Sequence, residues 1–130
     1  MQKPDTWYAY FHLRGSFDPD DVTRRVGVTP TETAREGEAI GTTSKNRPCS
    51  LWALHSRLGA SAPLEEQVKD VLDQLDENKA AFAELSRELG GTIQLVGYFR
   101  DVNPGVHFGL EIVGRIAEYG LCIDCDFYNC

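Results

Sequence analysis

The chain has 130 residues and a mass of 14.5 kDa, a length that fits one domain built around a single core. Hydrophobic residues make up 42% and charged residues 25%, which excludes a largely disordered chain. The 13 Lys and Arg residues against 20 Asp and Glu give a net charge of -7, which disfavours bulk nucleic acid and anionic membranes as partners, because both attract basic faces.

The first half of the chain predicts three strands and one short helix. Thr6 to Arg14 alternates apolar with polar side chains, as a strand with one buried face does. Asp18-Pro19-Asp20-Asp21 predicts a helix start with Asp18 as N-cap, and Gly27 predicts the helix end. We expect a brief edge strand near Thr31 to Arg35, a mobile loop from Gly37 to Pro48, and a strand over Cys49 to Ser56.

A long amphipathic helix opens the second half. Between Pro63 and Leu89 apolar residues recur every three to four positions, and Gly90-Gly91 predicts the helix end. Asp76-Glu77-Asn78 interrupts the apolar stripe, so we expect a bend or a break there. The remaining elements are a strand over Thr92 to Arg100, a helix over Phe108 to Tyr119 with Leu110, Val113, Ile116 and Ala117 on its apolar stripe, and a last strand over Leu121 to Tyr128.

These elements predict an α+β fold in one domain, residues 1–130, with the order β-α-β-β-α-β-α-β. Strands separated by helices favour parallel neighbours, and the β-β link favours an antiparallel pair. We therefore expect a single mixed sheet of four to five strands, of which a ferredoxin-like variant is one form. Three strands alternate cleanly instead of forming continuous apolar runs, so the three helices should cover one face only.

The uncovered face of this sheet is the candidate binding surface. We expect it to carry aromatic, basic and acidic side chains: Tyr8, Tyr10, His12, Arg14, Trp52, Tyr98, Arg100, Asp124, Asp126 and Tyr128. This mixture is typical of a recognition surface, although a one-sided sheet also exposes polar residues that have no function. Aromatic residues on a sheet also occur in RNA-binding domains, but Asp124 and Asp126 on the same face argue against nucleic acid.

Asp124 and Asp126 are also the candidates for chemistry. They lie two apart on one strand, so their side chains should lie close together on the same face. Such a pair can form an acid–base couple or a cation site, with His12 as a helper if the first and last strands are neighbours. A solvated ion-pair cluster with Arg100 is the alternative, because perturbed groups gather in clefts and the sequence indicates none. We predict no catalytic residue and no metal ligand.

The cysteines and the N-terminal residues predict the cellular compartment. The start lacks the apolar segment of a secretory signal, and no apolar run approaches the ~20 residues of a membrane helix. Cys122 and Cys125 form a Cys-x-x-Cys pattern, but a strand sends residues three apart to opposite faces. We therefore expect reduced thiols, with Cys125 buried and Cys130 at the frayed terminus, no structural zinc, no cofactor and a cytoplasmic location.

Several segments resemble a known family when they are taken in order. They are Tyr8-Ala9-Tyr10-Phe11, Gly15-Ser16-Phe17-Asp18-Pro19-Asp20-Asp21-Val22-Thr23, Gly27-Val28-Thr29-Pro30-Thr31, Ser50-Leu51-Trp52-Ala53-Leu54, Pro63-Leu64-Glu65-Glu66, Phe99-Arg100-Asp101, Asn103-Pro104-Gly105 and Asp126-Phe127-Tyr128. Their order and spacing resemble the small bacterial family known as domain of unknown function 4279, along nearly the whole chain. The resemblance implies a bacterial cytosolic α+β domain, and it implies no activity.

Small size, acidic charge and the lack of a catalytic motif favour a non-catalytic protein-interaction module. We expect an immunity- or antitoxin-like protein that binds a basic partner, such as a nuclease toxin, through the acidic and aromatic sheet face. The alternative is a small-molecule or cation-binding enzyme domain that uses Asp124 and Asp126, with the 37–48 loop folding over the sheet. A homodimer that buries the same face is the third hypothesis.

Overall fold

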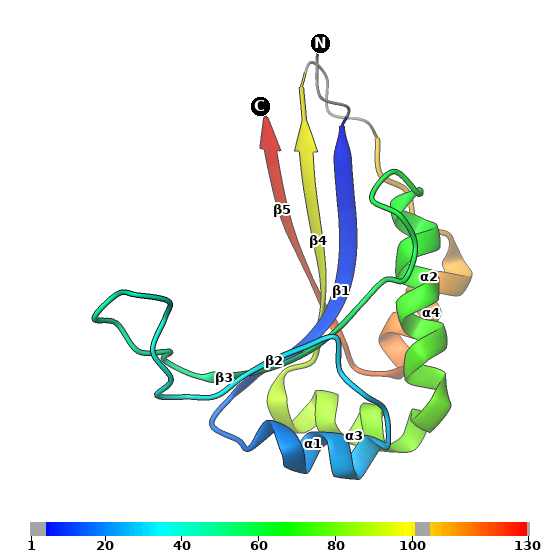
Figure 1. Ribbon diagram of the computed structural model, residues 1–130. Helices are drawn as coiled ribbons and strands as arrows, with labels where there is room; N and C mark the ends of the chain where they lie inside the picture. The colour runs from blue at the N-terminus through cyan, green and yellow to red at the C-terminus, as the bar shows by residue number, and fades with distance from the viewer. Residues whose placement is uncertain (1–4, 101–104, 130) are drawn as a thin grey trace.

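The computed structural model describes residues 5–100 and 105–129, which form one open mixed sheet with helices packed on one side (Figure 1). The elements are β1 (Thr6–Gly15), α1 (Pro19–Val26), β2 (Glu32–Ala34), β3 (Ser50–His55), α2 (Leu64–Leu75), the 3-10 turn η1 (Asp76–Asn78), α3 (Lys79–Leu89), β4 (Thr92–Phe99), α4 (Leu110–Glu118) and β5 (Cys122–Asn129). The strand order is β2-β3-β1-β4-β5. Among the described strand pairs only β4–β5 is parallel, so the predicted α+β fold with a mixed sheet is confirmed.

Local sequence signals explain where the elements begin and end. The Asp18 carboxylate accepts a hydrogen bond from the Asp20 N–H at 2.9 Å, which caps the first turn of α1. Gly27 ends that helix in the left-handed conformation, at φ 69°, where a residue with a Cβ would be strained. The predicted edge strand is β2, at one end of the sheet.

The predicted long helix is broken at the interrupted stripe, into α2, η1 and α3. Two residues of η1 bind neighbouring helices instead of continuing a straight helix. The Asp76 carboxylate accepts hydrogen bonds from the Tyr119 hydroxyl and, at 2.8 Å, from the Arg115 guanidinium, both at the α4 end. The Asn78 amide donates to the Val26 carbonyl at 3.0 Å, which gives a hydrogen-bond partner to a carbonyl at the C-terminal end of α1. These contacts hold α4 against α2 and α3 against α1.

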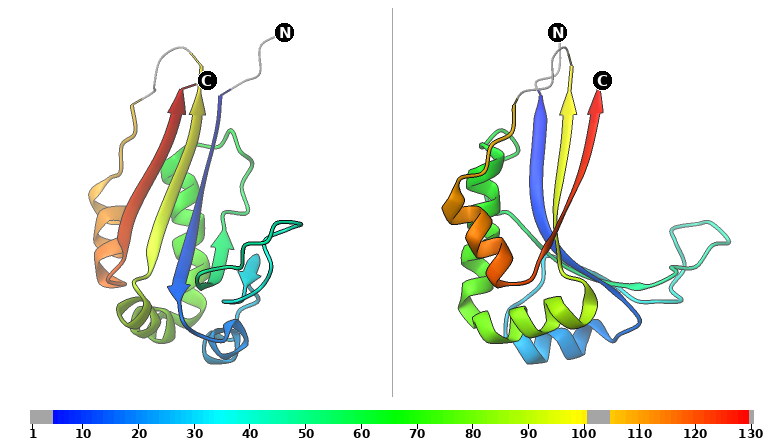
Figure 2. Two further views of the ribbon diagram at one scale, coloured as in Figure 1. Left: turned by 90° about the vertical axis from the view of Figure 1, so that its left-hand side faces the viewer. Right: turned by 180° about the vertical axis from the view of Figure 1, so that it is seen from behind.

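Tyr119 is buried beneath this junction, which reveals an error in the predicted face of α4. Ile112 and Ile116 share the buried side with Tyr119, whereas Leu110 is 88% exposed and Val113 is half-exposed. Burial and the Asp76 carboxylate raise the pKa of the Tyr119 hydroxyl far above its ordinary value. The inward stripe is therefore rotated from the predicted one, and α4 packs on α2 and not over β5 (Figure 2).

The core lies between the sheet and the helices, and the three central strands β3, β1 and β4 all contribute side chains to it. Its largest fully buried side chains include Phe11 and Leu13 of β1, Trp52 and Leu54 of β3, Leu72 and Leu75 of α2, Phe82 and Leu85 of α3, and Ile93 and Leu95 of β4. Phe11 and Phe82 meet edge to face, with ring centroids 5.7 Å apart. Within the described residues, none of the helices has the length and hydrophobicity required to span a bilayer.

One buried polar side chain, Gln67 of α2, completes the sheet where β3 stops. Its carbonyl oxygen accepts from the Ala9 N–H at 3.1 Å, and its amide donates to the carbonyls of Trp7 and Ala62 at 2.9 and 3.0 Å. These are strand-edge groups of β1 and of the adjacent loop, and Gln67 has no exposed surface. The side chain thus replaces a missing strand, which satisfies backbone groups that water does not reach.

Residues 35–49 connect β2 and β3 as a projecting hairpin, here called the arm. Backbone hydrogen bonds cross it, from Gly37 N–H to Arg47 O at 2.9 Å and from Ile40 N–H to Lys45 O at 2.9 Å. These bonds and the Ala39–Asn46 bridge pair the two sides of the predicted loop from Gly37 to Pro48, which is therefore a hairpin outside the named strands. The arm extends away from the helices and does not fold over the sheet (Figures 1 and 2).

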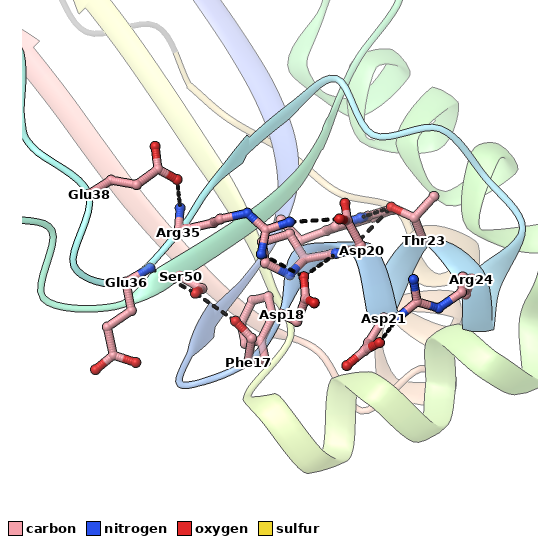
Figure 3. Close-up of polar contacts among 12 residues, drawn as sticks. Phe17, Asp18, Asp20, Asp21, Thr23, Arg24, Arg35, Glu36, Glu38 and Ser50 are labelled. Carbon is pink, nitrogen blue, oxygen red and sulfur yellow. Dashed lines mark hydrogen bonds and ion pairs between the residues drawn. The ribbon is translucent and has the colours of Figure 1, made fainter.

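The base of the arm is anchored to α1 (Figure 3). The Arg35 guanidinium donates to the Asp18 and Asp20 carboxylates at 2.8 and 2.7 Å. Beside it, the buried Ser50 hydroxyl accepts from the Glu36 N–H at 3.0 Å and donates to the Phe17 carbonyl at 2.7 Å. Both contacts tie the hairpin to the start of α1 and so set its direction.

Candidate functional site

The sheet face opposite the helices collects most of the predicted binding residues, and the left panel of Figure 2 views it face on. Strand register sets this arrangement: Tyr8 lies opposite Val96, which lies beside Asp126, and Tyr98 lies beside Tyr128. We call this surface the tyrosine–aspartate face, which consists of Tyr8, Tyr10, His12, His55, Gln94, Tyr98, Asp124, Asp126 and Tyr128. The first and last strands are not neighbours, because β4 lies between β1 and β5. His12 of β1 can therefore reach the aspartates of β5 only through a side chain of β4.

Two stacks of rings cross this face. Tyr98 and Tyr128 stack on neighbouring strands with ring centroids 5.2 Å apart and planes 17° apart. Tyr10 stacks on His55 of β3 at 4.6 Å and 7°. Stacked rings on adjacent strands are mutually supported, so they offer rigid apolar area to a partner at little cost in conformational entropy.

His55 is the site residue that sequence reasoning missed. The sequence does not single it out, because it has no histidine or cysteine partner at a metal-ligand spacing. Its Nε2 lies 3.4 Å from the Glu32 carboxylate of β2, and its ring joins Tyr10. Strand alternation carries the only usable signal, since His55 shares its face with Ala53, which pairs with His12.

Gln94 of β4 bridges His12 and Asp126. Its amide donates to the Asp126 carboxylate at 2.9 Å, so its carbonyl oxygen faces His12 Nε2 at 3.2 Å. His12 Nε2 must therefore carry the proton, which leaves Nδ1 as an acceptor. That Nδ1 atom is buried and has no hydrogen-bond partner within residues 5–100 and 105–129. Burial lowers the pKa of His12, so the ring is neutral at pH 7.

Acidification is expected to destabilise the protein through His12. The unfolded chain binds a proton at the ordinary pKa of 6.5, whereas the folded pKa lies lower, so the unfolded state gains protons first. Stability contributed by the neutral ring is complete above pH 6.5 and is lost as the pH falls below it. Urea unfolding at a series of pH values should show a steeper loss for wild type than for His12→Gln, which keeps a donor for Gln94. Parallel profiles for the two proteins would contradict this.

Trp52 does not belong to the candidate surface, and the prediction that placed it there is wrong. Trp52 has no exposed surface and lies on the helix side of the sheet, where its indole N–H donates to the Thr23 hydroxyl of α1 at 3.0 Å. It pairs with Leu13, a core residue of β1, so the register sets its side. Trp52 is therefore a core residue that joins β3 to α1.

The cationic candidates lie at the margins of the face. Arg14 is exposed near the end of β1. Arg100 directly follows β4, and its backbone N–H donates to the Asp5 carboxylate at 3.1 Å. Asp124 and Asp126 are exposed in the middle of β5, so the β5 side of the face is acidic between these two arginines' positions.

The cysteines differ from prediction in one respect. Cys125 is exposed and not buried, because no helix covers the side of β5 on which it lies. Among the described residues, Cys49, Cys122 and Cys125 are free thiols, and no three His, Cys, Asp or Glu side chains gather as a metal site. Cys130 lies outside the described residues. Partial desolvation by the neighbouring chain, followed by the carboxylates of Asp124 and Asp126, raises the pKa of the Cys125 thiol.

A cavity of about 340 Å³ lies away from this face. Its lining is mostly apolar and comes from the start of β1, the start of α2, the end of β4 and residues 105–107, with Trp7, Leu64, Phe99 and Val106 as its apolar walls. Sequence reasoning did not predict it, because its walls come from segments far apart in the chain.

The described residues form a small α+β domain, an open mixed sheet with helices on one face (Figure 2). Aromatic and acidic side chains lie on the opposite face. The chain belongs to the DUF4279 family, a domain of unknown function, whose family model matches residues 5–129. No curated protein and no solved structure matches the chain.

Proposed function

We propose that this protein is a non-catalytic interaction module that binds a basic protein partner through the tyrosine–aspartate face. A bacterial cytoplasmic immunity- or antitoxin-like role, in which the partner is a basic toxin such as a nuclease, is the form we favour. The net charge of -7 supports it, since complementary charge accelerates association with a cationic surface.

One observation carries the proposal: two exposed carboxylates lie beside a stacked pair of tyrosines. Asp124 and Asp126 project from β5, and Tyr128 of the same strand stacks on Tyr98. A Lys or Arg side chain can place its charge against a carboxylate and its alkyl stem or guanidinium plane against a tyrosine ring. Aromatic residues beside complementary charge are the combination that anchors protein interfaces.

The alternative, an enzyme domain built on Asp124 and Asp126, has less support. Asp126 is held by the Gln94 amide, and both carboxylates are exposed. The arm, which would have to close over the pair, projects away from it (Figure 2). An acid–base pair normally works in a cleft where burial and neighbours shift its pKa values.

Charge reversal on the face is expected to abolish partner binding. Random 12-residue peptides displayed on phage and selected on the wild-type protein should become enriched in Lys and Arg. The Kd of the strongest selected peptide should rise at least about tenfold for the D124K/D126K variant, because two charge pairs each become repulsive.

The matched control for this experiment is E66K/E111K. It makes the same change in net charge at exposed positions of α2 and α4, on the helix side. Its Kd should stay within about threefold of wild type in buffer of physiological ionic strength, where distant charges are screened. Equal losses in both variants, or selected peptides without cationic enrichment, would refute a specific acidic face.

A further inference from the structure

The outer edge of β5 ends the sheet with backbone groups that pair with no other strand of residues 5–100 and 105–129. Among described strands, β5 pairs only with β4, and it is last in the strand order. The Cys122 N–H donates to the Gly91 carbonyl at 3.0 Å, toward β4. Because backbone groups alternate along a strand, the N–H and C=O groups of Ile123, Cys125 and Phe127 point outward.

The side chains of β5 are exposed on both faces. On the helix side Ile123 is 50% exposed and Phe127 is 38% exposed, since α4 packs on α2. Phe127 is nevertheless held in place: its ring meets Phe99 edge to face at 5.5 Å and lies against Gly97. On the opposite face the same strand presents Asp124 and Asp126. The edge thus combines apolar anchors with charge.

Of the features that usually protect an edge, β5 has one, the charge of Asp124 and Asp126. Natural edge strands are short, or carry proline, charged side chains or a bulge, or lie under a helix. β5 has eight residues, without proline or a basic side chain, and pairs with β4 in unbroken register over its length. The two carboxylates repel an acidic strand but attract a basic one, so this edge is a template for a further strand that carries cations.

A second copy of the chain that pairs about the middle of the edge is a poor occupant. In an antiparallel pair about a two-fold axis, residues on the same face lie opposite each other. An axis at Cys125 brings Asp124 opposite Asp126 of the second copy, and an axis at Asp126 brings that carboxylate opposite itself. Directly opposed side chains lie about 5 Å apart, where like charges are destabilising. The same geometry favours a strand that carries cations at these positions.

We infer that the partner adds a strand to the edge of β5, and that this strand alternates cationic with apolar residues. Lys or Arg side chains pair with Asp124 and Asp126 on the tyrosine–aspartate face, and the intervening apolar side chains cover Ile123 and Phe127. This inference rests on the proposed function and specifies the partner: a basic protein with an exposed amphipathic strand or an extended segment of that pattern.

The test uses a synthetic peptide, acetyl-Val-Lys-Val-Lys-Val-Lys-Val-amide, with a fluorescent label and anisotropy as the readout. Two further peptides carry backbone N-methyl groups, one on its four valines and the other on its three lysines, which removes the N–H donors on one side of the strand and leaves every charge unchanged. One methylated peptide should lose at least about tenfold in affinity while the other binds like the parent. Loss at the valines reports antiparallel addition, and loss at the lysines reports parallel addition.

The outcomes separate this inference from the proposed function. If both methylated peptides bind like the parent while D124K/D126K abolishes binding, strand addition is refuted and the face remains the binding surface. If D124K/D126K binds the parent peptide as well as wild type does, the proposed function itself fails. A dimer by sedimentation at micromolar concentration that binds no peptide would also refute the inference, because the edge would then not be open to a basic strand.

Discussion

The Gln67→Leu variant is expected to lose about 3 kcal/mol of unfolding free energy, because each buried backbone group left without a partner costs about 1–3 kcal/mol. Leucine nearly matches the shape of glutamine but offers nothing to the Ala9 N–H or to the Trp7 and Ala62 carbonyls. Urea unfolding followed by circular dichroism measures the change, read as a lower midpoint at constant slope.

The matched control for this variant is Gln74→Leu, about two turns further along α2. Gln74 donates to the His55 carbonyl at 3.0 Å, but it is half-buried and its other partner, Asp70, lies near solvent. Its replacement should cost less than half as much as replacement of Gln67. Equal effects of the two substitutions would mean that Gln67 does not act as a substitute strand.

Trp52→Ala is expected to cost about 3–5 kcal/mol, the range for large aromatic side chains removed from a core. The substitution empties the space beside Phe11 and Phe82 and removes the donor to Thr23. Trp52→Phe should cost less and stay folded at room temperature. The folded Phe variant should bind the selected basic peptide like wild type, since Trp52 lies on the opposite side of the sheet from Asp124. A tenfold higher Kd in that variant would mean that Trp52 contributes to the binding surface after all.

Trp52 also shows where the sequence pattern stops being informative. In β3 both alternating sets are apolar, with Leu51 and Ala53 on one side and Trp52 and Leu54 on the other. Alternation alone cannot say which set faces the helices. The register with β1 decides it, because Trp52 lies opposite Leu13. β1 itself was predictable, since its polar side chains all occur on one face.

The other errors share a cause, which is that burial depends on neighbours far along the chain. Ile123, Cys125 and Phe127 form an ordinary apolar set, yet they are exposed because β5 is at the edge and α4 is drawn to α2 by Arg115 and Tyr119. Nothing within the strand itself indicates this. Caps and interrupted stripes were predictable because Asp18, Gly27 and Asp76 act within a few residues.

The central claim is that a basic partner binds at the tyrosine–aspartate face and along the edge of β5. Nuclear magnetic resonance of the ¹⁵N-labelled protein tests it most directly, by titration with the alternating valine–lysine peptide. The claim predicts that the largest amide shift changes fall on β5 between Ile123 and Tyr128 and on Tyr98 of β4, with little change in α2 and α3. Changes centred on Trp7, Leu64 and Val106, around the apolar cavity, would contradict it.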